Sequence, residues 1–525
     1  MKKEILICDA IANPGLKMLE KNFNISVQPG LSEAELVKVI PEYHALVVRS
    51  ETKVTSRVIK AAKLLKIIAR AGVGVDNIDV DAATTAGIVV VNAPRANALA
   101  AAEHTISLLL ALCRNIPQAD RSLRDGGWER KKFTGTGVFG KTLGIIGLGK
   151  IGSLVAERAR GLGMHVIASD PLATEEQAGK LGVDLASFTE LLKTADFVTL
   201  HVPLTEKTRH ILSRKEFARM KRGGRIINCS RGGIVDETAL LEALKKGRIA
   251  GAALDVFEKE PPINNPLLTL PNVIVTPHLG ASTEEAQTGV ATDIAEQIID
   301  FFADMPPVHA VNMPSVKPEV FATHRPYFLL AEKLGRFQAA LLEGSVRSIH
   351  ITFNGDFAGI ETPLISRYIL VGFLKPTFGD YINFVNAPIL TRSRGIKITE
   401  SVTDKKTKFT SLITASVVTS KKETTASGTL FNGEARIVQI DEYSIDLVPE
   451  GTVIIIHHKD RPGIIGRVGT LLGSHNINIA GMQVGRKTVR GDAVMALSID
   501  DPIGTNVLAE LNKLSGLTSS RVVQF

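Results

Sequence analysis

Short apolar runs recur along the first 300 residues, and amphipathic segments of helical length separate them. In the first hundred residues these runs are 4–8, 45–48, 66–69 and 88–91. The later ones are 142–147, 164–170, 196–201, 225–228, 250–255 and 273–276. Runs of this length between turn residues are typical of strands buried on both faces. Their alternation with helices predicts two open parallel α/β sheets, one for each group of strands.

Two longer helices connect these sheets. One is predicted at 98–114, where Ala and Leu dominate, between the two groups of strands. The other, at 283–302, follows the last strand and is long enough to return the chain to the first sheet. We therefore predict that residues 98–284 form a domain inserted in another, which is built from residues 1–97 and 285–316.

The pattern changes after a proline-rich linker at 305–318. Residues 317–450 predict an α+β domain, with helices at 327–342 and 363–374 and β-branched strands at 346–353, 395–399, 409–419 and 429–443. Residues 451–525 predict a βαββαβ domain. Its strands are 452–458, 478–484, 492–499 and 520–525, and its helices are 463–474 and 506–514. Neither domain carries a recognisable catalytic motif.

A glycine motif follows the first strand of the inserted domain. Gly147, Gly149 and Gly152 have the spacing G-x-G-x-x-G, and Asp170 ends the next strand. The first glycine permits the tight turn, the second lets a pyrophosphate approach the backbone, and the third lets the helix pack closely. The acid accepts hydrogen bonds from ribose hydroxyls and repels a 2′-phosphate. Strand, glycine loop, helix and acid together predict an NAD site rather than a glycine-rich turn.

Length and charge narrow the class of protein. The 525 residues exceed one domain, and the net charge of +8 is spread without a dense Lys/Arg block. We therefore expect a solvated surface and no nucleic-acid binding. Cys8, Cys113 and Cys229 form no paired or metal-spaced set, so we expect no metal site. No apolar run predicts a signal peptide or a membrane span, and we expect a cytoplasmic enzyme.

Three residues near strand ends have the chemistry for moving a hydride and a proton. His278 follows the strand at 273–276, and histidine exchanges protons near neutral pH. Glu260 also follows a strand, and a carboxylate beside an imidazole favours its protonated form. Arg231, in a glycine-rich loop, would hold an α-carboxylate through a two-pronged contact. From position alone, each also fits a structural role: a bonded loop histidine, a surface acid and a loop tether. His104 fits a packing role, and His201 is a rival base.

These motifs resemble those of the D-isomer-specific 2-hydroxyacid dehydrogenases. The matching segments are 147–152 with Asp170, His-Val-Pro-Leu at 201–204, Asn-Cys-Ser-Arg-Gly-Gly at 228–233 and Pro-His-Leu-Gly at 277–280. The resemblance covers roughly the first 300 residues. It implies a Rossmann-type NAD domain inserted in a flavodoxin-like substrate domain. It also implies Arg231, Glu260 and His278 as catalytic residues.

Site residues follow from the same resemblance. The implied NAD contacts are Gly147, Gly149, Lys150, Ile151, Gly152, Asp170, Val202, Pro203, Cys229, Ser230, Arg231, Asp255, His278, Leu279, Gly280 and Ala281. The implied substrate contacts are Arg49, Arg70, Arg130, Lys131 and Arg231, with Arg130 or Lys131 reaching a neighbouring subunit. Val73 stands where the family often has a hydroxyl residue, which removes one cofactor contact.

The chain is similar to the long members of this family, which carry an intervening domain and a C-terminal ACT domain. The similarity rests on Arg70–Asn77, Trp128–Phe133 and the two C-terminal domains. It implies NAD-dependent oxidation of 3-phospho-D-glycerate to 3-phosphooxypyruvate in serine synthesis, a homotetramer, and inhibition by L-serine at His458, Asp460 and Asn478. Asp460 departs from the asparagine that serine-binding ACT domains can have there. A glyoxylate or hydroxypyruvate reductase and a non-catalytic NAD-sensing regulatory protein remain the alternatives.

Overall fold

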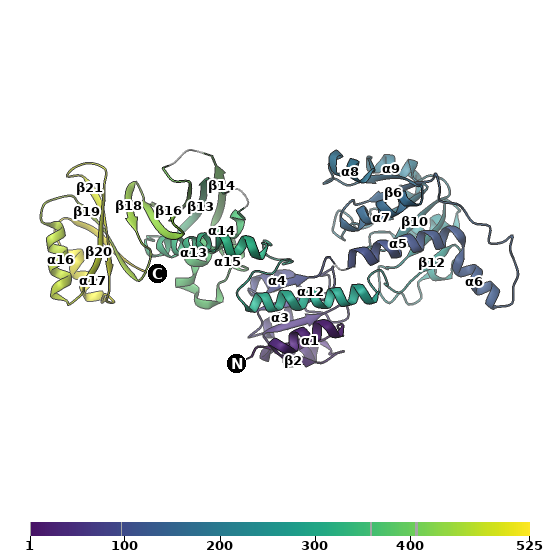
Figure 1. The fold of residues 1–525 in the computed structure, drawn as a ribbon, viewed down its shortest axis with the longest axis horizontal. Helices are drawn as coiled ribbons and strands as arrows, with labels where there is room; N and C mark the ends of the chain where they lie inside the picture. The colour runs from purple at the N-terminus through teal and green to yellow at the C-terminus, as the bar shows by residue number, and fades with distance from the viewer. Residues whose placement is uncertain (1, 96, 358–359, 405–407) are drawn as a thin grey trace. The chain divides into compact units, whose positions relative to one another are not determined.

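The computed structural model describes residues 2–95, 97–357, 360–404 and 408–525, which form two compact units. The first unit contains the chain up to Ala10 together with Met18–Asn92 and Ile294–Phe525. The second contains Ile11–Lys17 and Ala93–Asp293. Figure 1 shows the elements of both along the chain. The second unit is thus inserted, along the sequence, between parts of the first.

The first unit begins with a parallel five-stranded sheet in the order β2-β1-β3-β4-β5. Its strands are β1 (Glu4–Ile7), β2 (Asn24–Val27), β3 (Ala45–Val48), β4 (Ile67–Arg70) and β5 (Val89–Asn92). Helices α1 (Asn13–Asn22), α2 (Glu33–Val39), α3 (Ser56–Ala61) and α4 (Val80–Thr85) alternate with them. This order is the flavodoxin-like one, which confirms the predicted fold of the first domain.

The second unit contains a parallel seven-stranded sheet in the order β12-β11-β10-β9-β6-β7-β8. Its strands are β6 (Thr142–Ile146), β7 (His165–Ser169), β8 (Asp184–Leu185), β9 (Phe197–Leu200), β10 (Gly224–Asn228), β11 (Ile249–Leu254) and β12 (Val273–Val275). Its helices include α5 (Asn97–Arg114), α6 (Ile116–Arg124), α7 (Lys150–Gly161), α10 (Arg214–Arg219) and α11 (Glu237–Lys245). The order reverses between β6 and β9, and ligands bind beyond the carboxyl ends of the strands at such a point.

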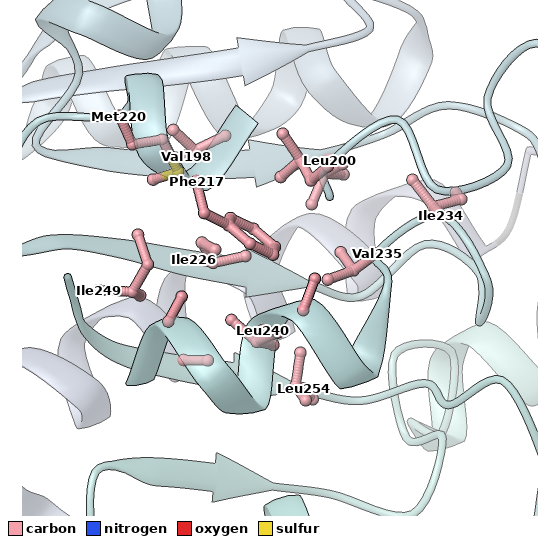
Figure 2. Packing of buried hydrophobic residues seen from close by; sticks show 14 of the residues in the cluster. Val198, Leu200, Phe217, Met220, Ile226, Ile234, Val235, Leu240, Ile249 and Leu254 are labelled. Atoms are coloured by element: carbon pink, nitrogen blue, oxygen red, sulfur yellow. The ribbon is translucent and has the colours of Figure 1, made fainter. Parts of the chain in front are cut away.

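Hydrophobic side chains cover both faces of this sheet. On one face Leu240 of α11 and Phe217 of α10 pack over Ile226, Val198 and Leu254 of the strands (Figure 2). On the other face, side chains from α5 and α7 pack against β6, β9 and β10. Because both faces are covered, the strands are apolar along almost their whole length. Polar side chains concentrate where the strands end.

The remainder of the first unit follows helix α12 (Glu284–Phe302). A six-stranded sheet has the order β14-β13-β15-β16-β17-β18. Its strands are β13 (Val346–Gly355), β14 (Lys397–Thr403), β15 (Ser411–Thr419), β16 (Glu423–Phe431), β17 (Glu434–Ile440) and β18 (Tyr443–Leu447), with α13 (Pro318–Ala340) and α14 (Thr362–Phe378). The predicted strand 429–443 is wrong, because turns at Asn432-Gly433 and Asp441 divide it. Helix α13 also starts earlier than predicted and continues through Pro326.

The last domain has the order β20-β21-β19-β22, with strands that pair antiparallel. Its elements are β19 (Thr452–Lys459), α16 (Ile464–Ser474), β20 (Ile479–Arg486), β21 (Asp492–Ile499), α17 (Thr505–Lys513) and β22 (Leu517–Gln524). The predicted βαββαβ arrangement is confirmed. Among the described residues, no helix combines the length and the apolar character needed to cross a membrane.

Candidate active site

The glycine loop between β6 and α7 has the shape that a bound pyrophosphate requires. Gly147 has φ of 93°, and a Cβ there would lie 2.6 Å from the carbonyl oxygen of His201. A Cβ on Gly152 would lie 2.1 Å from the carbonyl oxygen of Gly147, so the close helix packing requires glycine. By contrast, a Cβ on Gly149 would meet nothing within 4 Å. Gly149 caps α7 without a side-chain cap, so the amides of the first turn remain available to an anion.

Asp170 follows β7, as predicted, and it also anchors the glycine loop. Its Oδ2 atom accepts a hydrogen bond from the Leu148 amide at 2.8 Å, and its Oδ1 atom accepts one from the Leu172 amide at 2.8 Å. A carboxylate has about four acceptor sites, so each oxygen can still accept from a ribose hydroxyl. Lys150 and Ile151 occupy the first turn of α7 beside this loop. The residues present therefore fit a dinucleotide.

The ends of β9 and β10 extend the same edge of the sheet. Their register pairs Leu200 with Asn228, so the segments that follow lie side by side. The Ser230 hydroxyl donates to the Val202 carbonyl at 2.7 Å, which ties the segment containing Val202 and Pro203 to the Arg231 loop. Burial raises the pKa of Cys229 to about 12, so its thiol is neutral.

His278 and Glu260 form a direct pair. The His278 Nδ1 atom lies 2.8 Å from Glu260 Oε2, and the side chains are 46% and 37% exposed. The other oxygen of Glu260 accepts from the Phe257 amide at 3.1 Å. Burial raises the pKa of Glu260, but the hydrogen bond with His278 and the charge of that histidine outweigh burial. The net pKa is lowered, so Glu260 is a carboxylate at neutral pH.

Arg231 lies on a loop that packs against the segment carrying Glu260. A Cβ on Gly232 would lie 1.7 Å from the Phe257 carbonyl oxygen, so only glycine permits this approach. The Asn228 side chain donates to the Arg231 carbonyl at 3.1 Å, and the Arg231 Nη1 atom donates to the Ser230 carbonyl at 2.7 Å. The structure therefore gathers the loops of Arg231, Glu260 and His278 at one edge of one sheet.

Asp255, predicted as a cofactor contact, holds the His278 loop. Its carboxylate is fully buried and accepts from the Leu279 amide at 2.7 Å and the Gly280 amide at 2.8 Å. The His278 amide donates to the Asp255 carbonyl at 2.9 Å. Burial raises the pKa of Asp255, but hydrogen bonds to the carboxylate lower it further, so the group is anionic. Ala281 follows in the same loop.

Two contacts of Asp255 were not predicted from the sequence. The Thr276 hydroxyl donates to Asp255 Oδ1 at 2.5 Å, and His104 Nε2 lies 3.2 Å from the same oxygen. Thr276 is detectable in the sequence because it ends the strand next to β11. His104 lies 151 positions before Asp255 in the chain, and no local spacing links the two. For the rival base His201, burial lowers the pKa to about 4, so it stays neutral.

Arg49 and Arg70 lie in the first unit, at the carboxyl ends of adjacent strands. The register pairs Val48 with Arg70, and Arg49 directly follows β3. The Arg49 side chain donates to the Ala10 carbonyl at 3.4 Å. A Cβ on Gly72 would lie 1.6 Å from Arg70 Nη1, so this glycine makes room for the guanidinium. The two cations thus share one edge of the flavodoxin-like sheet.

Arg130 and Lys131 lie in the second unit, but not on the loops that carry Arg231, Glu260 and His278. They sit on an exposed turn after α6. Glu129 braces this turn through Lys132 at 2.9 Å. The apolar side chain of Trp128, two positions before Arg130, is also exposed, at 77%.

The three residues predicted to bind an effector do not meet within one chain. His458 pairs with Ala493 at the start of β21, whereas Asn478 precedes the Ile479–Ile499 pair at the other end of β21. Six residues of strand correspond to about 20 Å. Asp460, next to His458 in sequence, accepts from Arg486 Nη1 at 2.8 Å. The Nε2 atom of buried His458 has no hydrogen-bond partner among the described residues.

Models of known protein families match three parts of the chain. Residues 106–280 match the model of the D-isomer specific 2-hydroxyacid dehydrogenase NAD binding domain. Residues 323–441 match the D-3-phosphoglycerate dehydrogenase intervening domain, and residues 452–516 match the ACT domain.

Two curated relatives of similar length carry the same name. D-3-phosphoglycerate dehydrogenase of Archaeoglobus fulgidus is 47% identical over 99% of this chain and 100% of its own. The protein of the same name from Methanocaldococcus jannaschii is 47% identical over 99% of each chain. Among solved structures, a glyoxylate reductase from Paecilomyes thermophila is 32% identical with a TM-score of 0.56. The match covers 98% of the glyoxylate reductase but only 59% of this chain.

Proposed function

Because the chain belongs to the D-3-phosphoglycerate dehydrogenases, a branch of the D-isomer-specific 2-hydroxyacid dehydrogenases, we propose that it oxidises 3-phospho-D-glycerate to 3-phosphooxypyruvate. It is an NAD-dependent oxidoreductase. The observation that carries the proposed chemistry is the His278–Glu260 pair beside the Arg231 loop at the carboxyl edge of a dinucleotide-type sheet.

NAD fits the edge of the sheet in the second unit. The amides at the start of α7 would hold its pyrophosphate, and Asp170 would hold the ribose. Val202, Pro203, Cys229, Ser230 and the 278–281 loop would line the remainder. When bound, NAD accepts a hydride from the carbon that bears the substrate hydroxyl.

His278 is the proposed proton acceptor in this reaction. An ionised carboxylate only accepts hydrogen bonds, so the nitrogen facing Glu260, Nδ1, carries a proton. In the neutral ring the lone pair is then on Nε2, which takes the proton of the substrate hydroxyl. The Glu260 carboxylate stabilises the imidazolium that forms. The same groups return the proton in the reverse reaction.

Arginines complete the proposed substrate site. Arg231 orients the α-carboxylate and polarises the developing carbonyl, since a guanidinium matches a carboxylate with two hydrogen bonds. Arg49 and Arg70 supply further positive charge for the anionic substrate. Arg130 or Lys131 reaches the phosphate in a neighbouring subunit. The exposed Trp128 side chain close to them in sequence supports an interface between copies.

We assign the domains as the sequence predicts: residues 1–97 and 285–316 to substrate binding, 98–284 to NAD, 317–450 to the intervening domain and 451–525 to the ACT domain. The protein acts in the cytoplasm as a homotetramer in this proposal. A glyoxylate or hydroxypyruvate reductase is the weaker candidate, because the glyoxylate reductase of known structure matches only 59% of the chain. A non-catalytic NAD sensor does not require the His278–Glu260 pair.

Turnover of the purified full-length enzyme tests this function. We expect NADH to form from NAD and 3-phospho-D-glycerate when a trap removes the oxidised product. The absorbance of NADH measures the rate, and glycerate and lactate serve as comparison substrates. No turnover with an active trap, or faster turnover of an acid without phosphate, would contradict the proposed substrate.

Asp170→Asn should weaken the preference for NAD over NADP. The amide oxygen still accepts from the Leu148 amide, the acceptor of the Leu172 amide is lost, and the charge that repels a 2′-phosphate is removed. Loss of about 1.4 kcal/mol of discrimination corresponds to a tenfold drop in the NAD/NADP ratio of kcat/KM. Steady-state kinetics with both cofactors measures it, with Asp184→Asn on β8 as the matched control. An unchanged ratio would contradict the ribose role.

We further propose that L-serine inhibits at a site shared by two copies of the ACT domain. His458 and Asp460 lie at one end of the sheet and Asn478 at the other, so a single chain does not assemble the three. A second copy would supply the missing group. The Nε2 atom of His458, which has no hydrogen-bond partner among the described residues, would pair with the ligand, and Asp460 would accept from its amino group.

Asn478→Ala should raise the serine concentration for half-inhibition by about tenfold or more, which corresponds to one lost hydrogen bond to a charged ligand. Turnover without serine should stay within about twofold of wild type, because Asn478 lies in the C-terminal βαββαβ domain, which carries none of the proposed NAD, substrate or catalytic residues. Asn506→Ala, on the exposed start of α17, is the matched control. Inhibition that is unchanged in Asn478→Ala would place the effector site elsewhere.

A further inference from the structure

We infer that His104 is a positioning residue for proton transfer, acting on His278 through Asp255. This inference rests on the proposed function, in which His278 exchanges the proton. The sequence alone favours a packing role for His104, on helix α5. The structure instead directs its imidazole at the buried carboxylate that holds the His278 loop.

The His278 loop has a backbone conformation that needs support. His278 has φ of 55°, which a residue with a side chain adopts only at a cost. Its amide donates to the Asp255 and Thr276 carbonyls at 2.9 and 3.0 Å. The next two amides, of Leu279 and Gly280, both donate to the Asp255 carboxylate. Asp255 therefore fixes the position of the His278 imidazole.

Asp255 needs its own orientation fixed, because one carboxylate oxygen serves each amide. A rotation of the carboxylate would misdirect both hydrogen bonds. The Thr276 hydroxyl and His104 Nε2 both contact Oδ1, at 2.5 and 3.2 Å, and they also contact each other at 3.1 Å. The three side chains come from α5 and from the ends of β11 and β12.

The pattern of donors in this cluster identifies the proton on His104. The Thr276 hydroxyl donates its one hydrogen to Asp255, so its oxygen is left as an acceptor. His104 Nε2 then faces two acceptors, the carboxylate and this oxygen. Only a protonated Nε2 satisfies both, so this nitrogen is the donor. The relevant property of His104 is thus a rigid N–H aimed at Asp255, supplied from a different helix.

The proposed function already assigns hydride and proton transfer to the edge where this loop lies. A displacement of about 1 Å in a reacting group can lower the rate by about 10²-fold. Loss of the His104 donor should therefore slow the chemical step. It should change NAD affinity less than kcat, since the glycine loop and Asp170, at the ends of β6 and β7, still hold the pyrophosphate and the ribose while the 278–281 loop lines only the remainder.

The test compares His104→Leu, which removes the donor, with His104→Gln, whose amide places an N–H near the position of Nε2. His165→Leu, an exposed histidine on β7 of the same unit, is the matched control. We expect His104→Leu to lower kcat about tenfold or more, and His104→Gln to restore it to within about threefold of wild type. The NAD dissociation constant by calorimetry should change less than kcat, and KM and the unfolding midpoint of the cofactor-free enzyme should change little. The primary isotope effect with substrate deuterated at the oxidised carbon should rise in His104→Leu.

Unchanged kcat in His104→Leu, equal loss in His104→Gln, or loss of NAD binding instead of kcat would overturn the inference. If His104→Leu does not fold, Thr276→Val, which removes the hydroxyl that also contacts Asp255 Oδ1 while keeping the side-chain shape, must lower kcat more than it lowers NAD affinity. Wild-type turnover separates the two proposals. If the wild type oxidises only another 2-hydroxy acid, the proposed substrate fails, and the same variants measured with that acid still decide the role of His104.

Discussion

His278→Ala is expected to lower kcat for oxidation of 3-phospho-D-glycerate by about 10²- to 10⁴-fold, the usual contribution of a positioned general base. This loss corresponds to about 3–5 kcal/mol in the activation barrier. NAD affinity should stay within about threefold, because the loop holds its shape through backbone amides bound to Asp255. Steady-state kinetics and calorimetric titration with NAD measure the two effects separately. Full retained activity would contradict the assignment of His278.

The structure supplies a matched control for this variant. His210 also has a left-handed backbone, with φ of 51°, and its Nε2 atom lies 3.0 Å from Glu258 Oε1. His210→Ala therefore removes the same kind of side chain and the same kind of pair. Its activity should remain within about threefold of wild type. His278→Asn is a useful second variant, since asparagine tolerates the left-handed conformation better than alanine.

The sequence predicts the NAD edge well because its signals are local. The strand–turn–helix unit of a dinucleotide site needs glycine at three places, which are Gly147, Gly149 and Gly152. Asp170 ends the next strand. Parallel strands present their carboxyl ends at one edge, so Glu260 and His278 are expected near each other once their strands are recognised. The 2.8 Å contact between them agrees with that expectation.

Local sequence patterns do not predict contacts that depend on how distant segments pack together. His104 reaches Asp255 because α5 packs on the sheet, and the hydrophobic pattern of that helix carries no information about which histidine faces a carboxylate. The separation of Asn478 from His458 likewise depends on the register of β19 and β20 against β21. Because packing fixes the register, residues that a family assigns to one binding site need not lie close together within one chain.

The wrong prediction of one strand at 429–443 has a different cause, because the local sequence does contain the turn that divides it. Asn432-Gly433 is a typical two-residue hairpin turn, with φ of 51° and 84°. The β-branched residues on both sides favour strands and obscure the turn when only composition is considered. Pro326 misleads in the opposite direction. Proline usually interrupts a helix, yet α13 continues through Pro326.

Glu260→Gln should lower the maximal rate and move the pH profile. The net lowered pKa of Glu260 keeps it ionised at neutral pH, so the native enzyme has an anion 2.8 Å from His278. The amide removes that charge while retaining a hydrogen-bonding group. The imidazolium that forms during oxidation then loses its stabilising partner, and we expect kcat to fall about ten- to hundredfold.

The direction of the pH change follows from the same charge. Oxidation requires neutral His278, and an adjacent anion favours the protonated ring. Without the anion the ring stays neutral to lower pH, so the acid limb of kcat/KM for oxidation moves to lower pH. Reduction requires the protonated ring, so its basic limb moves to lower pH by the same amount. Profiles in both directions, with Glu258→Gln as the control, measure this coupled shift. A lowered rate with both limbs unmoved would mean that Glu260 shapes the loop without acting on the proton held by His278.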